Sequence, residues 1–248
     1  MARQKGILKI AGTIDGITFY HSQDGSLLRK KTSLNKDRVS NDPRFLRTRE
    51  NNKEFGNAAT AGKLIRDTLR SLIFGTADNR LIPRLSKAMM KIKSFDNTSP
   101  RGKRNVAAGI THPAAQEVLQ DFDFNTNSNL NTVLFSPFTL DKASGEITIP
   151  GFLPASGVMA PDGATHLSLV SAFAKVDFAN GEGELQVSPA QNIALVATST
   201  HVVLQPPAVP TLPGTSFYLL KITFLQLVNG VAYPLKNSSA MAILDIAP

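Results

Sequence analysis

Short β-favouring runs separated by turn residues fill the second half of the chain. Of all the features of the sequence, they restrict most strongly which folds the chain can adopt. The runs lie at residues 131–135, 146–149, 167–178, 185–188, 201–205, 217–228, 231–235 and 240–246. Asn229-Gly230 separates two of them, and this dipeptide is typical of a two-residue hairpin turn. Short strands joined by glycine and proline turns predict an antiparallel β-sandwich of the immunoglobulin or fibronectin III type.

A similar pattern appears near the N-terminus, where Asp15-Gly16 lies between the β-favouring runs 7–10 and 17–20. Asp-Gly suits a tight hairpin because both central residues of that turn need positive φ. No helix signal follows Gly12 or Gly16, although a phosphate-binding glycine loop requires one. These glycines are therefore predicted to turn the chain within a β-hairpin and meander.

Two basic helices are predicted between the two β-rich regions. Asn41-Asp42-Pro43 combines a capping side chain with a proline at the first helical position. Apolar residues then recur at spacings of three, four and seven as far as Leu72, which predicts a helix of about thirty residues. Residues 83–93 predict a second helix by the same criterion.

The charge of the chain changes sign along its length. Residues 1–110 hold 23 Lys and Arg against 9 Asp and Glu, a net charge of +14. Residues 111–248 hold 4 against 10, a net charge of −6, which together with the first part makes the total of +8. We therefore predict an α+β protein of two domains, a basic β-hairpin and helical region at 1–110 and an acidic β-sandwich domain at 111–248.

The residue types of common catalytic and cofactor sites do not assemble in the sequence. Cysteine is absent, and the four histidines lie far apart. A string from Gly56 to Lys63 superficially resembles a nucleotide-binding loop, but it has one intervening residue too many and Leu64 replaces the required Ser or Thr. We therefore expect no catalytic, cofactor-binding or metal-binding residues, no cofactor and no enzymatic activity.

Nine basic side chains are the candidate contacts with a partner subunit or with phosphate groups. They are Arg44, Arg47, Lys53, Lys63, Arg66, Arg70, Arg101, Lys103 and Arg104. Acidic residues such as Glu50, Glu54 and Asp67 are interspersed among them. This pattern favours a salt-bridged surface over a continuous phosphate track.

Two functions remain open from the sequence. The first is a non-enzymatic structural protein that self-associates into a filament, tube or other homo-oligomer, because a basic and an acidic part in one chain permit head-to-tail contacts. The second is a nucleic-acid-binding protein that uses the basic N-terminal half to contact phosphates. We favour the first hypothesis.

The sequence lacks the segments that direct a chain to or through a membrane. The first twenty residues contain no apolar run of the length found in signal peptides, and no stretch approaches 18 uninterrupted apolar residues. A cytoplasmic protein without a membrane partner is therefore expected.

Several short motifs are spread over nearly the full chain, most densely near its N-terminus. They are MARQKG at 1–6, GTI at 12–14, ITFY at 17–20, DG at 24–25, NDP at 41–43, RTREN at 47–51, EFG at 54–56 and PLKN at 234–237. Together they resemble a family of uncharacterised Bacteroidota proteins that share a domain of unknown function. The resemblance implies a shared architecture, and it carries no activity, cofactor or site residue.

Overall fold

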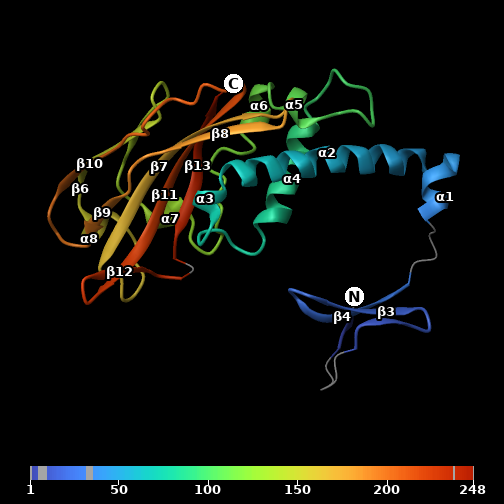
Figure 1. The fold of residues 1–248 in the computed structure, drawn as a ribbon, viewed down its shortest axis with the longest axis horizontal. Helices are drawn as coiled ribbons and strands as arrows, with labels where there is room; N and C mark the ends of the chain where they lie inside the picture. The colour runs from blue at the N-terminus through green and yellow to red at the C-terminus, as the bar shows by residue number, and fades with distance from the viewer. Residues whose placement is uncertain (1, 5–9, 32–35, 237, 248) are drawn as a thin grey trace. The chain divides into compact units, whose positions relative to one another are not determined.

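The computed structural model describes residues 2–4, 10–31, 36–236 and 238–247 of the chain (Figure 1). Two compact units are present, Met1–Arg49 and Glu50–Pro248, which we name the N-terminal unit and the C-terminal unit. The boundary expected from the charge pattern, near residues 110–113, lies inside the C-terminal unit. Each unit is described by itself.

The N-terminal unit contains an antiparallel sheet with the strand order β1-β4-β3-β2. Its strands are β1 (Ala2–Arg3), β2 (Gly12–Ile14), β3 (Ile17–Ser22) and β4 (Gly25–Lys30), followed by helix α1 (Lys36–Asn41) and the 3₁₀ helix η1 (Pro43–Phe45). Asp15 and Gly16 join β2 to β3 with φ values of 45° and 77°. These values are those of the predicted hairpin turn, so the interpretation of this glycine as a turn residue is confirmed.

The predicted helix start at Asn41-Asp42-Pro43 is also found. The Asp42 carboxylate accepts a hydrogen bond from the Arg44 N–H at 2.9 Å, and Pro43 occupies the first helical position. The chain continues from η1 into α2 (Leu46–Thr68) and then, after a short break, α3 (Arg70–Ile73). The single long helix of the prediction is therefore three consecutive helical segments.

Helices α2 and α4 (Leu81–Lys93) pack against each other in the C-terminal unit through small residues of α2. Ala58, Ala61 and Gly62 are buried, and a methyl group at Gly62 would touch Leu85 and Met89 of α4. Phe55 is one of the apolar residues whose spacing of three, four and seven predicted a helix up to Leu72, and it was therefore expected on the buried side, but it is 54% exposed. The prediction was wrong at this position: Phe55 lies seven residues before Gly62 and so on the same side of α2, but there it borders an open hollow with Ile82 and Met90 of α4 instead of a closed core.

Two antiparallel sheets complete the C-terminal unit. The strands are β5 (Thr139–Asp141), β6 (Glu146–Phe152), β7 (His166–Asp177), β8 (Glu182–Val187), β9 (Gln191–Ala194), β10 (Thr200–Leu204), β11 (Thr215–Val228), β12 (Val231–Pro234) and β13 (Ala240–Ala247). In the six-stranded sheet β11 pairs with β7 on one side and with β13 and β12 on the other, while β8 and β9 pair with β7. The three-stranded sheet has the order β10-β6-β5.

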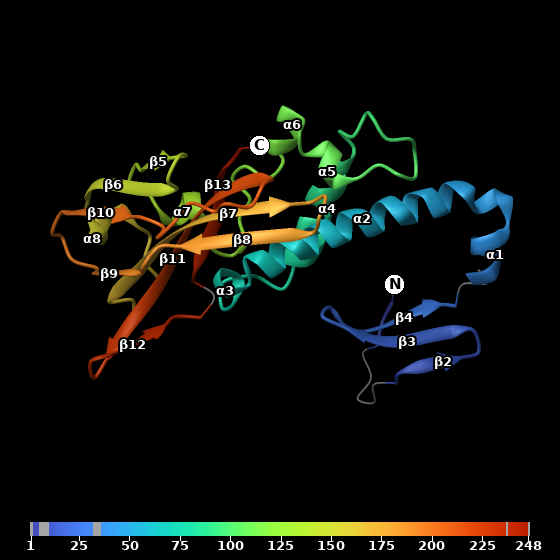
Figure 2. The ribbon, with the colours of Figure 1, turned by 45° about the horizontal axis from the view of Figure 1, so that its top comes forward.

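The six-stranded sheet separates two hydrophobic cores, because successive side chains of a strand point to opposite faces. On one face, Ala172 and Ala174 of β7 and Phe217 of β11 pack against α2 and α4. On the other face, Leu169 of β7 and Ile222 of β11 pack with residues of β6 and β10. Figure 2 shows β5, β6 and β10 gathered at the end of this unit away from α4. The unit therefore consists of a helical layer, a large sheet and a small sheet.

The mixed α+β class with antiparallel sheets is confirmed, whereas an immunoglobulin-like sandwich is not. An immunoglobulin-like sandwich consists of two packed sheets without a helical layer. Here helices cover much of one face of the large sheet. The run 131–135, predicted as a strand, lies largely in helix α7 (Leu130–Val133). Asn129 precedes this turn, and the Asp123 carboxylate accepts a hydrogen bond from the Leu130 N–H at 2.9 Å, which stabilises a helical start.

The remaining helices of the C-terminal unit are single turns that connect the layers. They are α5 (Val106–Gly109), α6 (Pro113–Gln116) and α8 (Pro154–Gly157). None of the helices in the described ranges combines the length and the apolar character needed to span a bilayer.

Candidate functional site

The nine predicted basic contacts lie on successive segments of the chain. Arg44 is in η1 and Arg70 is in α3. Helix α2 carries Arg47, Lys53, Lys63 and Arg66, and the loop between α4 and α5 carries Arg101, Lys103 and Arg104. Arg66 and Arg104 are half-buried and the others are exposed.

Several of these basic groups are bound to other groups of the protein. Lys63 donates a hydrogen bond to Asp67 at 2.7 Å, one helical turn further along α2. Arg101 forms an ion pair with Glu50 at 3.3 Å. The salt-bridged surface expected from the interspersed charges is therefore present at these two places, and the positive charge available to a phosphate is reduced there.

Arg104 belongs to a buried ion cluster centred on Glu54. Arg104 donates from Nε and Nη2 to the two carboxylate oxygens, at 2.9 Å each, and the buried Lys93 ammonium donates at 2.5 Å. The Gly102 N–H donates to the same carboxylate at 2.7 Å. The hydrogen bonds from Arg104 lower the pKa of Glu54 to about 2, with Lys93 and Gly102 adding to this effect against the opposing effect of burial.

Asp96 organises the other end of the same loop. Its carboxylate accepts hydrogen bonds from the N–H groups of Thr98, Ser99 and Asn105 and from the Thr98 hydroxyl. Burial raises the pKa of Asp96, but the hydrogen bonds outweigh it and hold that pKa well below its usual range. Asp96 therefore binds both ends of the loop 96–105, and Glu54 ties this loop to α2.

Sequence reasoning grouped Glu54 with the surface acids and missed this cluster. One signal was present in the spacing: Glu54 precedes Ala58, Ala61 and Ile65 by four, seven and eleven residues, which places all four on one side of a helix. Its partners Lys93 and Arg104 could not be identified, because they are 39 and 50 residues away in the sequence.

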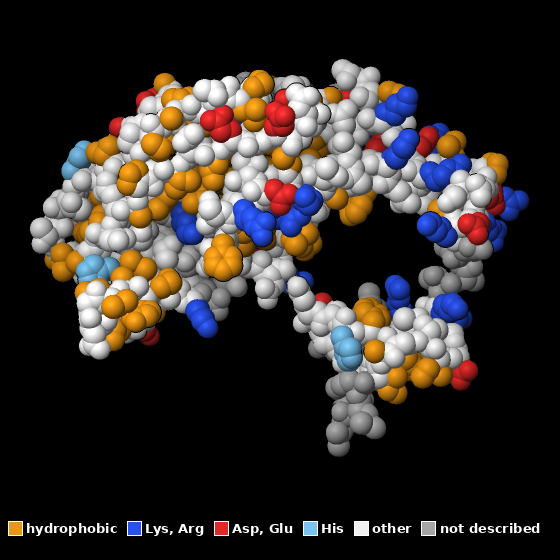
Figure 3. Space-filling view, viewed as in Figure 1, with side chains coloured by type: hydrophobic (Ala, Val, Ile, Leu, Met, Phe, Trp, Pro, Cys, Tyr) orange, Lys and Arg blue, Asp and Glu red, His pale blue; other side chains and the backbone are white. Residues whose placement is uncertain are grey.

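The sheet of the N-terminal unit has an apolar face, which we call the open face. Ile14 pairs with Ile17 across β2 and β3, and Phe19 pairs with Leu28 across β3 and β4. Directly paired residues project to the same side, and residues two apart on one strand do so as well, so these four side chains share one face. Ile14 and Ile17 are 52% and 39% exposed. Figure 3 shows hydrophobic side chains grouped on this part of the molecule.

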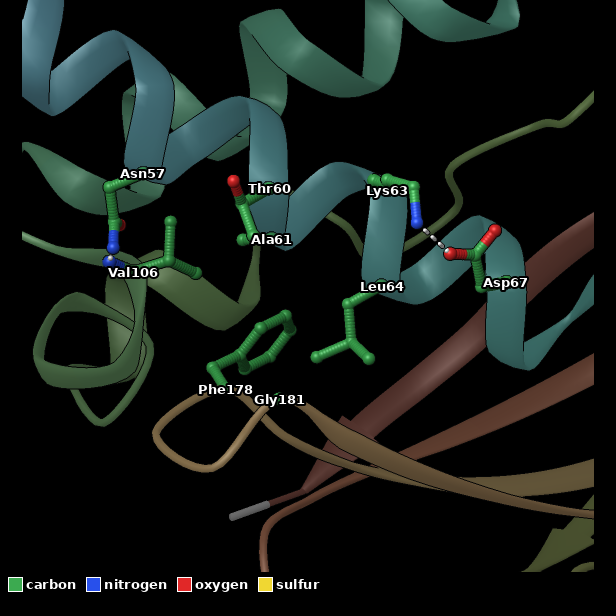
Figure 4. Close-up of a pocket in the computed structure, with 9 residues that line it drawn as sticks. All are labelled: Asn57, Thr60, Ala61, Lys63, Leu64, Asp67, Val106, Phe178 and Gly181. Atoms are coloured by element: carbon green, nitrogen blue, oxygen red, sulfur yellow. Dashed lines mark hydrogen bonds and ion pairs between the residues drawn. The ribbon is translucent and has the colours of Figure 1, made fainter.

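A hollow of about 200 Å³ lies between α2 and the turn that joins β7 to β8 (Figure 4). Leu64 and Phe178 approach each other in it, and three of its polar side chains, those of Asn57, Lys63 and Asp67, form hydrogen bonds. Lys63 binds Asp67, and the Asn57 side chain accepts a hydrogen bond from the Val106 N–H at 3.0 Å. The charged groups of the hollow are therefore paired with each other, and we assign no ligand to it.

A larger groove of about 740 Å³ lies on the helix-facing side of the six-stranded sheet, beyond the end of α3. It is lined by sheet residues that the helices leave uncovered and by the end of α3, and Lys221 supplies its one charged side chain among the described lining residues. We call it the Lys221 groove. Sequence reasoning did not single out Lys221.

The four histidines belong to different elements or loops of the chain. His21 bonds to Ser26, His166 to Thr165, and His112 caps α6, while His201 is exposed on β10. Within the described ranges, no group of three or more His, Asp or Glu side chains is arranged to hold a metal ion. Comparisons of this chain with protein-family models, with curated proteins and with solved structures found no match.

Proposed function

We propose that this protein is a non-enzymatic structural protein that self-associates into a homo-oligomer through the open face of its N-terminal sheet. The open face is the observation that carries the proposal. A sheet with one apolar face is stabilised when a second layer covers that face. Among the hydrophobic residues described in the N-terminal unit, Leu27 alone is buried, so the described residues of this unit supply no such layer.

Charge favours a second copy of the chain as the covering layer. The N-terminal unit holds 11 Lys and Arg against 4 Asp and Glu, a net charge of +7, whereas the C-terminal unit holds 16 against 15, a net charge of +1. Within the C-terminal unit, residues 111–248 carry −6. The N-terminal unit of one copy is therefore attracted to this acidic part of a neighbour and repelled by another N-terminal unit.

Such a contact joins two different surfaces and is head-to-tail. Head-to-tail contacts produce a ring when the rotation between neighbours closes, and a filament or tube when it does not. The proposal includes both forms, and electron microscopy of the assembled protein distinguishes them.

Light scattering coupled to size-exclusion chromatography tests the proposal on the full chain. We expect assembly that grows with protein concentration and weakens between about 0.1 M and 1 M salt, because the Debye length shrinks from about 10 Å to about 3 Å. The double substitution Ile14→Thr/Ile17→Thr keeps good strand formers and should reduce assembly. The matched control is Thr13→Ser/Thr18→Ser, on the opposite face of the same strands. A monomer at every concentration in low salt would contradict the proposal.

Nucleic-acid binding is the second candidate, and the net charge of +14 over residues 1–110, which include Arg44 and Lys53, favours it. Binding through phosphate contacts weakens steeply with salt, roughly in proportion to the number of contacts. A gel-shift titration with DNA and RNA at about 50 mM salt tests it. Loss of binding in Arg44→Gln/Lys53→Gln, with assembly unchanged, would favour this candidate over self-association.

A further inference from the structure

The helical layer covers only part of its face of the six-stranded sheet. The register pairs Lys221 with Val170 and Thr223 with Ser168, so these four residues share the face on which Ala172 and Ala174 pack against helices. Helix α3 ends at Ile73, and the sheet residues beyond it line the Lys221 groove. The groove is thus built from the part of this face that the helices leave uncovered.

Lys221 lies in the middle of this face with incomplete pairing. Its ammonium donates a hydrogen bond to the Leu72 carbonyl oxygen at 2.8 Å, near the end of α3. An ammonium has three N–H donors, and among the described residues no carboxylate lies within ion-pair distance of this one. Partial burial lowers the pKa of Lys221, and no neighbouring charge contributes. A half-buried cation without a counter-ion attracts an anion from outside the chain.

We propose that the Lys221 groove binds an organic monocarboxylate with an apolar body, whose carboxylate pairs with the Lys221 ammonium. The groove volume is within the range of small-molecule sites. Val170 and Leu225 offer apolar contacts for the body of the ligand, and the hydroxyls of Ser168 and Thr223 offer hydrogen bonds near the cation.

The chemistry of the groove favours a carboxylate over a phosphate. Phosphate sites in proteins combine arginine or several cations with converging backbone N–H groups. The described lining has one lysine and no arginine, and its only helical residues belong to α3, a single turn. A single ammonium with nearby hydroxyls matches one negative charge.

Isothermal titration calorimetry and methyl NMR with octanoate and 1-octanol test this inference on the full chain. We expect octanoate to bind at least about tenfold more tightly than 1-octanol and to shift the methyl signals of Val170 and Leu225. The substitution Lys221→Met should remove the preference for octanoate. Lys175→Met is the matched control, because Lys175 is a half-buried lysine of the same sheet on its opposite face.

The comparison of the two ligands in the unmodified protein needs no variant, so it holds even where Lys221→Met disturbs folding. Equal affinities for octanoate and 1-octanol, no binding of octanoate, or shifts confined to residues outside the groove would each overturn the inference. Tighter binding of octyl phosphate would overturn the assignment of the ligand class. Self-association plays no part in these measurements, so either proposal can fail without the other.

Discussion

Glu54 on α2 and Arg104 in the loop after α4 form a bidentate ion pair, with both N···O distances at 2.9 Å. The pair joins residues 50 positions apart and brings a basic loop onto a helix. The same carboxylate also holds Lys93 and the Gly102 N–H. Arg104, which the sequence suggested as a phosphate contact, therefore has a structural role in this fold.

Replacing Glu54 with glutamine should destabilise the C-terminal unit by about 3 to 5 kcal/mol, because Lys93 then remains buried without a counter-charge. Urea denaturation followed by circular dichroism measures the change. The control Glu50→Gln alters the more exposed pair with Arg101, whose side chain is 50% exposed, and should cost at most about 1 kcal/mol. Equal losses of stability in the two variants would contradict the distinction between a buried and an exposed pair.

The same cluster predicts how stability depends on pH. The folded pKa of Glu54 is about 2, below its ordinary value of 4.5. Its contribution is therefore fully present above about pH 4.5 and is lost as the pH falls toward 2. Asp96 acts in the same direction. The unfolding free energy of the unmodified protein should fall more steeply over this window than that of Glu54→Gln, and parallel curves would argue against the assignment.

Two glycines of the helical layer should respond to alanine in opposite ways. Gly56 lies in α2 with open space where a methyl group would stand, so Gly56→Ala should stabilise the protein by about 0.5 to 1 kcal/mol. A methyl group at Gly109 would press on the Ile92 carbonyl, so Gly109→Ala should destabilise it by more than about 1 kcal/mol. Thermal unfolding of the two variants checks both signs, and two changes of the same sign would contradict the packing described.

The turn at Gly16 predicts a local effect in the N-terminal sheet. Gly16→Val places a β-branched side chain at a φ of 77° and should weaken the β2–β3 hairpin by about 1 kcal/mol or more. Amide hydrogen exchange of Ile17–Ser22 should then become faster, while Thr18→Val, in extended backbone of the same hairpin, leaves it nearly unchanged. Unaltered exchange in Gly16→Val would show that the turn does not control this hairpin.

Local features of the fold could be predicted from the sequence alone. Asp15-Gly16 and Asn229-Gly230 form hairpin turns because the conformation of such a turn depends on the two residues that make it. Asp42-Pro43 starts a helix for the same kind of reason. Long β-favouring runs such as 167–178 and 217–228 are strands, since their length and residue types suit few other structures. In each case the determining interactions lie within a few residues.

Only the tertiary structure decided the features that depend on distant partners. The run 131–135 became largely helical because the Asp123 carboxylate binds the Leu130 N–H at the start of the turn, and strand propensity depends on the surroundings of a segment. Arg104 became a buried ion partner and Lys221 became the cation of an open groove through residues far away in sequence. Local patterns determine turns and helix ends, whereas burial and charge pairing follow from which surfaces the folded chain brings together.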